Sequence, residues 1–162
     1  MTPAKTVSVM LLPAAATMLF VQACGGSDWA VAQEAADPIE GVWESQISVR
    51  DCSTSAVIGS FRGVNVLHRG GTLTDTNGGA PTSRGPGFGV WSKSADGSYA
   101  VRFRFYRYNS DGSLAGSNVI TSTRQLGAGG TSFEGSTRNE VRDLAGTVLQ
   151  TLCVTDVGTR VF

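Results

Sequence analysis

Clusters of turn-forming residues interrupt the chain at short, even intervals after Pro38. Gly, Asn, Asp, Pro and Ser gather in the segments RDCSTS, HRGG, TNGGAPTSRGPG, SADGS, NSDGS, GAGG and RDLAG. The segments between these clusters have the length and the alternation of strands. No segment shows a sustained helical period. The chain beyond Pro38 is therefore predicted to be all-β.

This punctuation predicts about eight strands. SADGS and NSDGS each contain Asp-Gly, a strong hairpin signal, and DLAG is a further candidate turn. Successive hairpins without a long crossover favour an antiparallel up-and-down barrel over a Greek-key sandwich. The expected strands are Gly41–Arg50, Val57–His68, Gly71–Asp75, Gly87–Ser94, Tyr99–Asn109, Gly116–Leu126, Thr131–Val141 and Gly146–Thr155 with an extension to Phe162.

Alternation assigns the inner faces of the first and last expected strands. These faces carry Trp43, Ile47 and Val49 in the first strand, and Val148, Leu152, Val154 and Phe162 in the last. If closure pairs the two strands with Cys52 opposite Cys153, then Trp43 faces Phe162 and inner positions meet inner positions. A bulge at Asp156–Gly158 would shift this register by one residue.

The cysteines indicate a disulfide. Of three cysteines, Cys24 belongs to the N-terminal signal, which leaves Cys52 and Cys153. In an oxidising compartment these two form the expected bridge, which contributes about 4 to 5 kcal/mol in the chain-entropy model. The alternatives are two separate thiols or a metal pair. Since His68 is the only histidine and no Cys-x-x-Cys occurs, no metal site is predicted.

The first residues read as a targeting signal. Lys5 is the only charge before the apolar run Val7–Val21, which is too short and too poorly flanked for a stable transmembrane helix. Residues 1–23 are therefore predicted to be a signal peptide, residues 24–38 a flexible tether, and residues 39–162 the barrel domain. The expected location is extracytoplasmic.

The segment VQACGGS resembles the lipobox of bacterial lipoproteins. Val21, Ala23 and Cys24 match that pattern, while Gln22 is an unusual occupant. The resemblance implies that Cys24 is lipidated. Because Gly25 stands where an inner-membrane lipoprotein often has aspartate, it also implies an anchor in the outer membrane, facing the periplasm. The alternative is a secreted protein, cleaved after Ala23 or after the AVA that ends at residue 32.

Charge argues against nucleic acid as a partner. Thirteen Lys and Arg balance thirteen Asp and Glu, so no net field recruits a polyanion or an acidic membrane surface. The run YAVRFRFYRY mixes basic and aromatic residues, but strict alternation indicates a barrel wall. Its inward residues are expected to be Val101, Phe103 and Phe105, and its outward ones Arg102, Arg104 and Tyr106.

Gly41-Val42-Trp43 in the first strand, with Arg160 near the end of the last, resembles the signature of the calycin barrels, which include the lipocalins. The resemblance implies that Trp43 plugs the barrel floor and that Arg160 packs across its ring, an interaction worth about 1 to 2 kcal/mol. The strings VLHRGGTLTDT and GFGVW are also similar to strings in uncharacterised exported bacterial proteins. That second likeness supports the fold and implies no activity.

No catalytic constellation emerges, since His68 has no serine in a nucleophile elbow and no glycine-rich segment opens a helix. The calycin resemblance implies a binding module for a small apolar or amphipathic ligand, without a cofactor, under a lid at Thr76–Pro86. An alternative is an interaction protein that inhibits an extracytoplasmic enzyme, and a third is an allene-oxide-cyclase-like isomerase. An open interior would favour a ligand, and a filled one an interaction. The candidate ligand-lining residues are Val101, Phe103, Phe105, Phe88 and His68.

Overall fold

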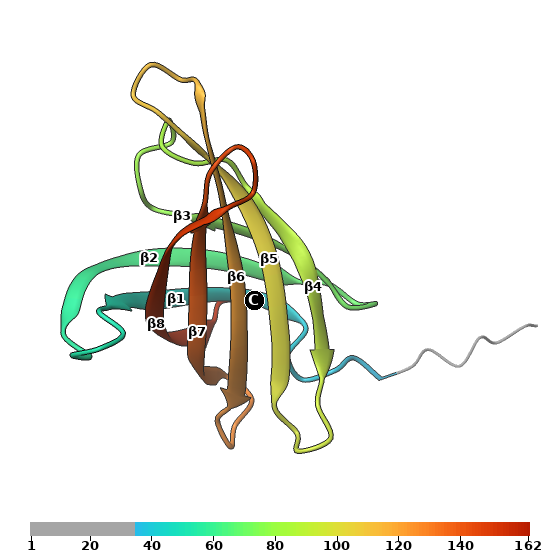
Figure 1. Cartoon of the computed structure of the whole chain (residues 1–162). Helices are drawn as coiled ribbons and strands as arrows, with labels where there is room; N and C mark the ends of the chain where they lie inside the picture. The colour runs from blue at the N-terminus through green and yellow to red at the C-terminus, as the bar shows by residue number, and fades with distance from the viewer. Residues whose placement is uncertain (1–34) are drawn as a thin grey trace, which may run out of the picture. The chain divides into compact units, whose positions relative to one another are not determined.

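The computed structural model describes residues 35–162 (Figure 1). Each of its eight strands pairs antiparallel with the next, and β8 pairs with β1, so the sheet closes into an up-and-down barrel. The predicted fold class is confirmed. The strands are β1 (Gly41–Arg50), β2 (Val57–Leu67), β3 (Thr72–Asn77), β4 (Gly87–Lys93), β5 (Tyr99–Tyr108), β6 (Leu114–Leu126), β7 (Ser132–Arg142) and β8 (Val148–Arg160).

Part of the predicted domain organisation lies outside residues 35–162. The signal peptide, the lipobox with Cys24 and most of the tether lie outside them. Contacts with the barrel begin within the predicted tether, because the Tyr99 hydroxyl donates to Asp37 Oδ1 at 2.6 Å. Within residues 35–162, no helix has the length and apolar character needed to span a membrane.

Because the strands alternate in direction, the connections gather at two ends. We call one the floor end, formed by residues 37–40, 68–71, 94–98 and 127–131, and the other the mouth end, formed by residues 51–56, 78–86, 109–113 and 143–147. In Figure 1 the β4–β5 and β6–β7 hairpins of the floor end lie at the bottom, and the β5–β6 hairpin rises at the top.

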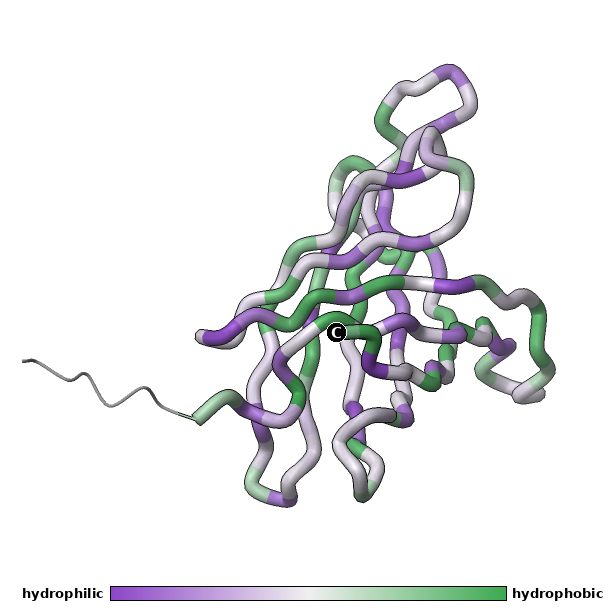
Figure 2. Tube along the Cα trace, turned by 180° about the vertical axis from the view of Figure 1, so that it is seen from behind, coloured by the Kyte–Doolittle hydropathy of each residue, from purple (hydrophilic) through white to green (hydrophobic). Residues whose placement is uncertain are grey.

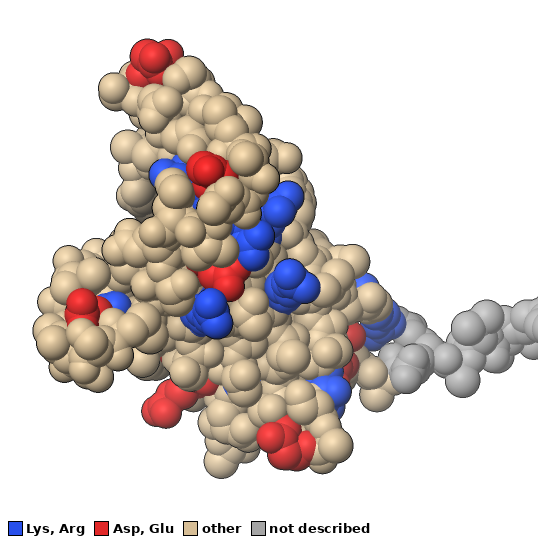
Figure 3. All heavy atoms as spheres, viewed as in Figure 1, with Lys and Arg blue, Asp and Glu red and all other residues tan. Residues whose placement is uncertain are grey.

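Buried and exposed residues alternate along the strands. Figure 2 shows hydrophobic and hydrophilic residues interleaved along the chain. In β5, Val101 and Phe103 are buried while Arg102 and Arg104 are exposed, as predicted. Figure 3 shows charges of both signs scattered over one outer face. The largely apolar core comprises Ile39, Trp43, Leu67, Leu73, Tyr99, Val101, Phe103, Ile120 and Phe133.

The seam between β1 and β8 corrects the predicted register. Trp43 pairs with Arg160, and Arg50 pairs with Cys153, so the register differs by two residues from the one expected. The reason is that Cys52 lies in the turn after β1, from which its disulfide reaches back to Cys153 in β8. No bulge interrupts this ladder at Asp156–Gly158, so the difference in register does not come from a bulge there. A shift of two residues keeps the inner faces of β1 and β8 matched, so Trp43, Ile47 and Val154 stay on their predicted faces. Phe162, predicted to face inward, instead lies beyond the end of β8 and is 84% exposed, and Val148 is 43% exposed.

Candidate functional site

The floor end is closed by a tryptophan. Trp43 is fully buried, and its Nε1 donates to the Ile39 carbonyl at 2.8 Å. Ile39 belongs to the segment 37–40 and is itself fully buried beneath the barrel. The Arg160 guanidinium lies 4.4 Å from the centre of the Trp43 ring and donates to the Glu40 carbonyl at 2.6 Å. These contacts leave no entry for a ligand beside Trp43.

Two glycines make room for the packing at this end. Gly41 has a positive φ of 132°, and a Cβ there would collide with the Arg160 guanidinium. A Cβ at Gly158 would overlap the ring of Phe133, which packs edge-on against Trp43 at a centroid distance of 5.2 Å. The first Gly-x-Trp therefore begins β1 because glycine admits the arginine that covers the tryptophan.

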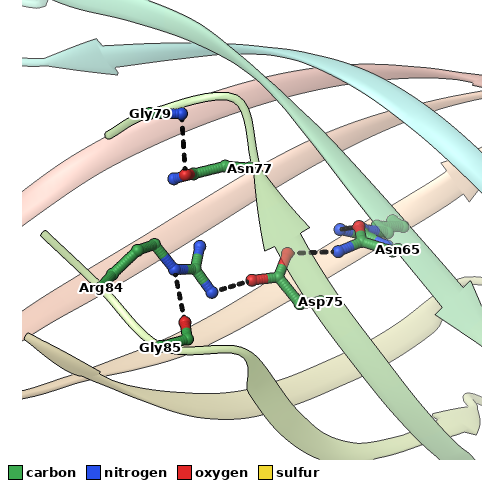
Figure 4. A network of polar contacts seen from close by, with 7 residues as sticks. Asn65, Asp75, Asn77, Gly79, Arg84 and Gly85 are labelled. Atoms are coloured by element: carbon green, nitrogen blue, oxygen red, sulfur yellow. Dashed lines mark hydrogen bonds and ion pairs between the residues drawn. The ribbon is translucent and has the colours of Figure 1, made fainter. Parts of the chain in front are cut away.

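A layer of charged and amide side chains crosses the barrel above this floor. We call it the polar layer, and its members are Asn65, Asp75, Arg124 and Asp156, each at most 6% exposed. Arg124 Nη2 donates to Asn65 Oδ1 at 2.7 Å and lies 3.2 Å from Asp156 Oδ2. Asn65 Nδ2 donates to Asp75 Oδ2 at 2.6 Å, as Figure 4 shows. The layer therefore links four side chains from four strands.

Strand register and one glycine bring this layer together. Asn65 and Asp75 are direct partners in the β2–β3 ladder, on the inner face. Arg124 and Asp156 are two strands apart, with Gly135 of β7 between them in both ladders. A Cβ at Gly135 would collide with the Asp156 carboxylate. The missing side chain therefore lets Asp156 extend toward Arg124.

Arg84 joins the polar layer from the mouth end. It lies in the connection between β3 and β4, yet its side chain is only 10% exposed. Its Nη2 forms an ion pair with Asp75 Oδ1, and its Nε donates to the Gly85 carbonyl at 2.9 Å (Figure 4). Its guanidinium also stacks 3.7 Å from the centre of the Phe105 ring. The guanidinium is thus held on three sides.

The loop that carries Arg84 is attached to the wall. The Gly85 amide donates to the Tyr106 carbonyl at 2.9 Å, and the Tyr108 amide donates to the Ser83 carbonyl at 3.0 Å. These two bonds continue the β5 ladder for a short distance. The segment Thr76–Pro86, expected to act as a lid, therefore lies against the mouth with one charged side chain inserted.

Burial dominates the electrostatics of the polar layer. Loss of hydration raises the pKa of Asp75, and the nearby Arg84 guanidinium only partly opposes this effect. Burial likewise lowers the pKa of Arg124, against the attraction of Asp156 and Asp75. Arg124 is also stacked on an aromatic ring, 4.4 Å from the centre of Phe133. Its charge is compensated by neighbours rather than by water.

A cavity of ≈ 70 Å³ opens in the mouth half of the barrel. Its apolar wall consists of Ile47, Val49, Phe61, Phe103, Phe105, Ile120 and Val154. Its polar wall consists of Asn65, Asp75, Asn77, Arg84, Arg124, Thr137, Asn139 and Asp156. Drug-sized ligands usually occupy pockets of roughly 300 Å³ or more. In this conformation the space suits a small molecule or the end of a larger one.

The candidate lining residues divide into two groups. Phe103 and Phe105 line the cavity, while Val101 is 1% exposed and belongs to the core. Phe88 is 61% exposed on the outer wall, because Gly87 and Gly89 hold the inward positions of β4. His68 follows the floor end of β2 and is exposed, with its carbonyl accepting a bond from Trp91 Nε1 at 3.0 Å. Phe88 and His68 therefore lie outside the interior cavity.

The polar lining was not predicted. Asp75 and Arg124 are polar residues at inward positions, whereas the predicted inner faces comprise apolar residues. The available signal was parity, since Asp156 shares its face with Val154 and Arg124 shares its face with Ile120. The same alternation, applied to polar as well as apolar residues, assigns Asp156 and Arg124 to the inner face.

Other functional signals are sparse. Residues 35–162 contain no group of three or more His, Cys, Asp or Glu side chains arranged to hold a metal ion. A comparison with protein-family models gives no match, and none of the curated proteins compared matches the chain in sequence.

Proposed function

We propose that this chain is a binding protein that holds a small amphipathic molecule in its mouth-side cavity. The observation that carries the proposal is the mixed wall, in which Phe103, Ile120 and Val154 face the same space as the polar layer. A purely apolar ligand would displace water from the polar wall and offer no partner to its remaining donors, which costs free energy. A molecule with one polar and one apolar end satisfies both walls.

The size of the cavity limits this ligand. The floor half is filled by Trp43, Phe133 and their neighbours, and Arg84 occupies part of the mouth. Because ≈ 70 Å³ remains, a long acyl chain would require movement of residues 78–86. An inhibitory interaction protein was expected to have a filled interior, so the open space supports ligand binding instead. The isomerase hypothesis stays a prediction.

The proposal places the barrel outside the cytoplasm. Support comes from the disulfide between Cys52 and Cys153, which favours an oxidising compartment. On this proposal residues 1–23 direct export and Cys24 carries the lipid anchor, with the barrel facing the periplasm. Metabolic labelling with a palmitate analogue tests the anchor: wild type should be labelled and Cys24→Ser should not. Labelling of Cys24→Ser, or none of wild type, would reject it.

Titration with hexan-1-ol, a small neutral amphiphile, tests ligand binding. Amide chemical shifts should change saturably at Phe103, Ile120 and Val154, and Ile120→Trp, which fills the cavity, should abolish the change. Phe88→Ser is the control, because Phe88 lies on the outer wall and its loss should not affect the titration. Shifts confined to the outer wall, or unaffected by Ile120→Trp, would contradict the proposal.

A further inference from the structure

We infer that the polar end of the ligand is a single carboxylate, bound at the mouth by Arg84 together with the amides of Asn77 and Asn139. This inference rests on the proposed binding function and names the class of molecule: a small monocarboxylic acid with an aliphatic body.

The first observation is the free donor of Arg84. Its Nε and Nη2 are engaged with Gly85 and Asp75, and Phe105 supports the face of the guanidinium. Within residues 35–162, Nη1 makes no hydrogen bond, and Figure 4 shows it directed away from Asp75 toward the side on which Asn77 lies. A guanidinium already fixed by three contacts loses little conformational entropy when it binds an anion.

The second observation concerns two amides on the same cavity wall. Asn77 Oδ1 accepts a bond from the Gly79 amide at 3.1 Å, and Asn139 Oδ1 accepts one from Asn118 Nδ2 at 2.8 Å. Both oxygens are thus used, while neither Nδ2 has a partner among the residues that the structure describes. The cavity therefore offers N–H groups where an acceptor would complete the bonding.

The third observation is the charge of the mouth half. The backbones of Arg84 and Arg107 form an isolated antiparallel β-bridge, and Arg107 shares the inward face of β5 with Phe105. Arg84 and Arg124, which line the cavity, balance the carboxylates of Asp75 and Asp156. Arg107, beside this lining, adds one positive charge to the mouth half. One bound carboxylate would neutralise it, whereas a phosphate dianion would leave a buried negative charge.

The fourth constraint is the body of the ligand. Ile120, Phe103 and Val154 border the same space and present no polar atoms. An apolar body packed on these side chains gains roughly 25 cal/mol for each Å² removed from water. The fifth constraint is size, since ≈ 70 Å³ excludes long-chain acids unless the loop 78–86 moves. A short aliphatic acid, of which only one end enters the cavity, meets both constraints.

The test compares three matched probes: hexanoate, hexan-1-ol and hexylammonium, titrated at pH 7 and followed by amide chemical shifts. Hexanoate should bind about tenfold more tightly than hexan-1-ol, as expected for a charge-assisted hydrogen bond. In Arg84→Gln the affinity ratio of hexanoate to hexan-1-ol should fall to about one. Arg62→Gln is the control, because Arg62 is an exposed outer arginine paired with Glu44, and its ratio should match wild type.

The outcomes separate the two proposals. Equal binding of hexanoate and hexan-1-ol in the cavity, or an unchanged ratio in Arg84→Gln, would overturn the carboxylate and leave the binding function intact. Failure of every probe to perturb the cavity amides would overturn both. If Arg84→Gln does not fold, Asn77→Leu and Asn139→Leu serve instead. Each should lower hexanoate affinity relative to hexan-1-ol, and an unchanged ratio in both variants would overturn the assignment.

Discussion

Arg160 and Trp43 stand directly opposite each other across the seam that closes the barrel, with the guanidinium 4.4 Å from the ring. Trp43→Ala should cost about 3 to 5 kcal/mol of unfolding free energy, because it removes a large, fully buried side chain. Arg160→Ala should cost less. Chemical denaturation of both single variants and the double variant should show a coupling energy above about 0.5 kcal/mol.

The exposed pair Glu44–Arg62, 3.1 Å apart, provides the control cycle. Exposed ion pairs of this kind contribute roughly 0 to 1 kcal/mol, so the coupling energy between Glu44 and Arg62 should be smaller than that between Trp43 and Arg160. Additive effects of Trp43→Ala and Arg160→Ala would mean that the stacked geometry adds nothing to stability.

The disulfide should be the largest single covalent contribution to stability. Cys52 and Cys153 are 101 residues apart, and closing a loop of that size contributes at most about 5 kcal/mol in the chain-entropy model. Urea unfolding should therefore shift to a much lower midpoint when dithiothreitol is added. The double variant Cys52→Ser/Cys153→Ser should start at that lower midpoint and be insensitive to the reductant. Equal midpoints for the oxidised and reduced wild type would contradict this.

The fold was predictable because its signals are local. Asp-Gly turns and strict alternation are written into short segments, and so β5 and its inward Phe103 could be placed without knowing any other strand. The register of the seam was not local. It depended on which residue of β1 stands opposite Cys153. That residue is Arg50, two positions before Cys52, so the pairing differs by two positions from one in which the two cysteines face each other.

The site was harder to predict for a different reason. Asp75 and Arg124 occupy inward positions, but a single charge at such a position has no meaning until its partner is known. The partners Asn65 and Asp156 come from other strands, and they approach only after the barrel closes and Gly135 leaves space. For Phe88, by contrast, parity was available in the sequence, since Trp91 three residues on takes the inward position.

Asp51 should titrate far below an ordinary aspartate. Its Oδ1 accepts bonds from the Ser53 and Thr54 amides at 2.9 and 2.8 Å and from both hydroxyls, which lowers the pKa from 3.8 to about 2. Because the folded pKa is below the unfolded one, this stabilisation is present above pH 3.8 and is lost as the pH falls toward 2. Carboxyl carbon chemical shifts should show the low pKa directly.

Asp51→Asn is the comparison variant, because its amide oxygen keeps an acceptor without a titrating proton. Between pH 4 and 2, wild type should lose unfolding free energy faster than this variant does. Parallel pH profiles would show that the turn does not prefer the ionised form.

Asp75 should show the opposite behaviour. Burial raises its pKa above 3.8, so the folded chain keeps this proton over a range in which the unfolded chain has released it. Its contribution to stability is therefore full below pH 3.8 and is lost as the pH rises through the folded pKa. Arg84→Met removes the nearby cation and should raise the pKa of Asp75 further, as carboxyl carbon shifts would report. A lower pKa in Arg84→Met would refute the pairing.

Gly158 should not tolerate a methyl group. A Cβ there overlaps the Phe133 ring, which is held between Trp43 and Arg124, so Gly158→Ala should cost about 1 to 3 kcal/mol. Gly59 is the matched control, because a Cβ at that position meets nothing within 4 Å. Thermal unfolding should leave Gly59→Ala near wild type. Equal melting temperatures for both variants would mean that the floor can repack.

The pairing of β1 with β8 determines when the chain can finish folding. During synthesis the N-terminal part of the chain appears first, so one edge of β1 stays unpaired until β8 has been made. Cys52 and Cys153, which the disulfide joins, are 101 residues apart. An open strand edge invites pairing with other chains. Two interactions join the seam, the stacking of Arg160 on Trp43 and the disulfide, and each involves a residue of β8. Truncation of the thirteen-residue strand β8 would therefore remove both interactions at once and leave open strand edges that promote aggregation.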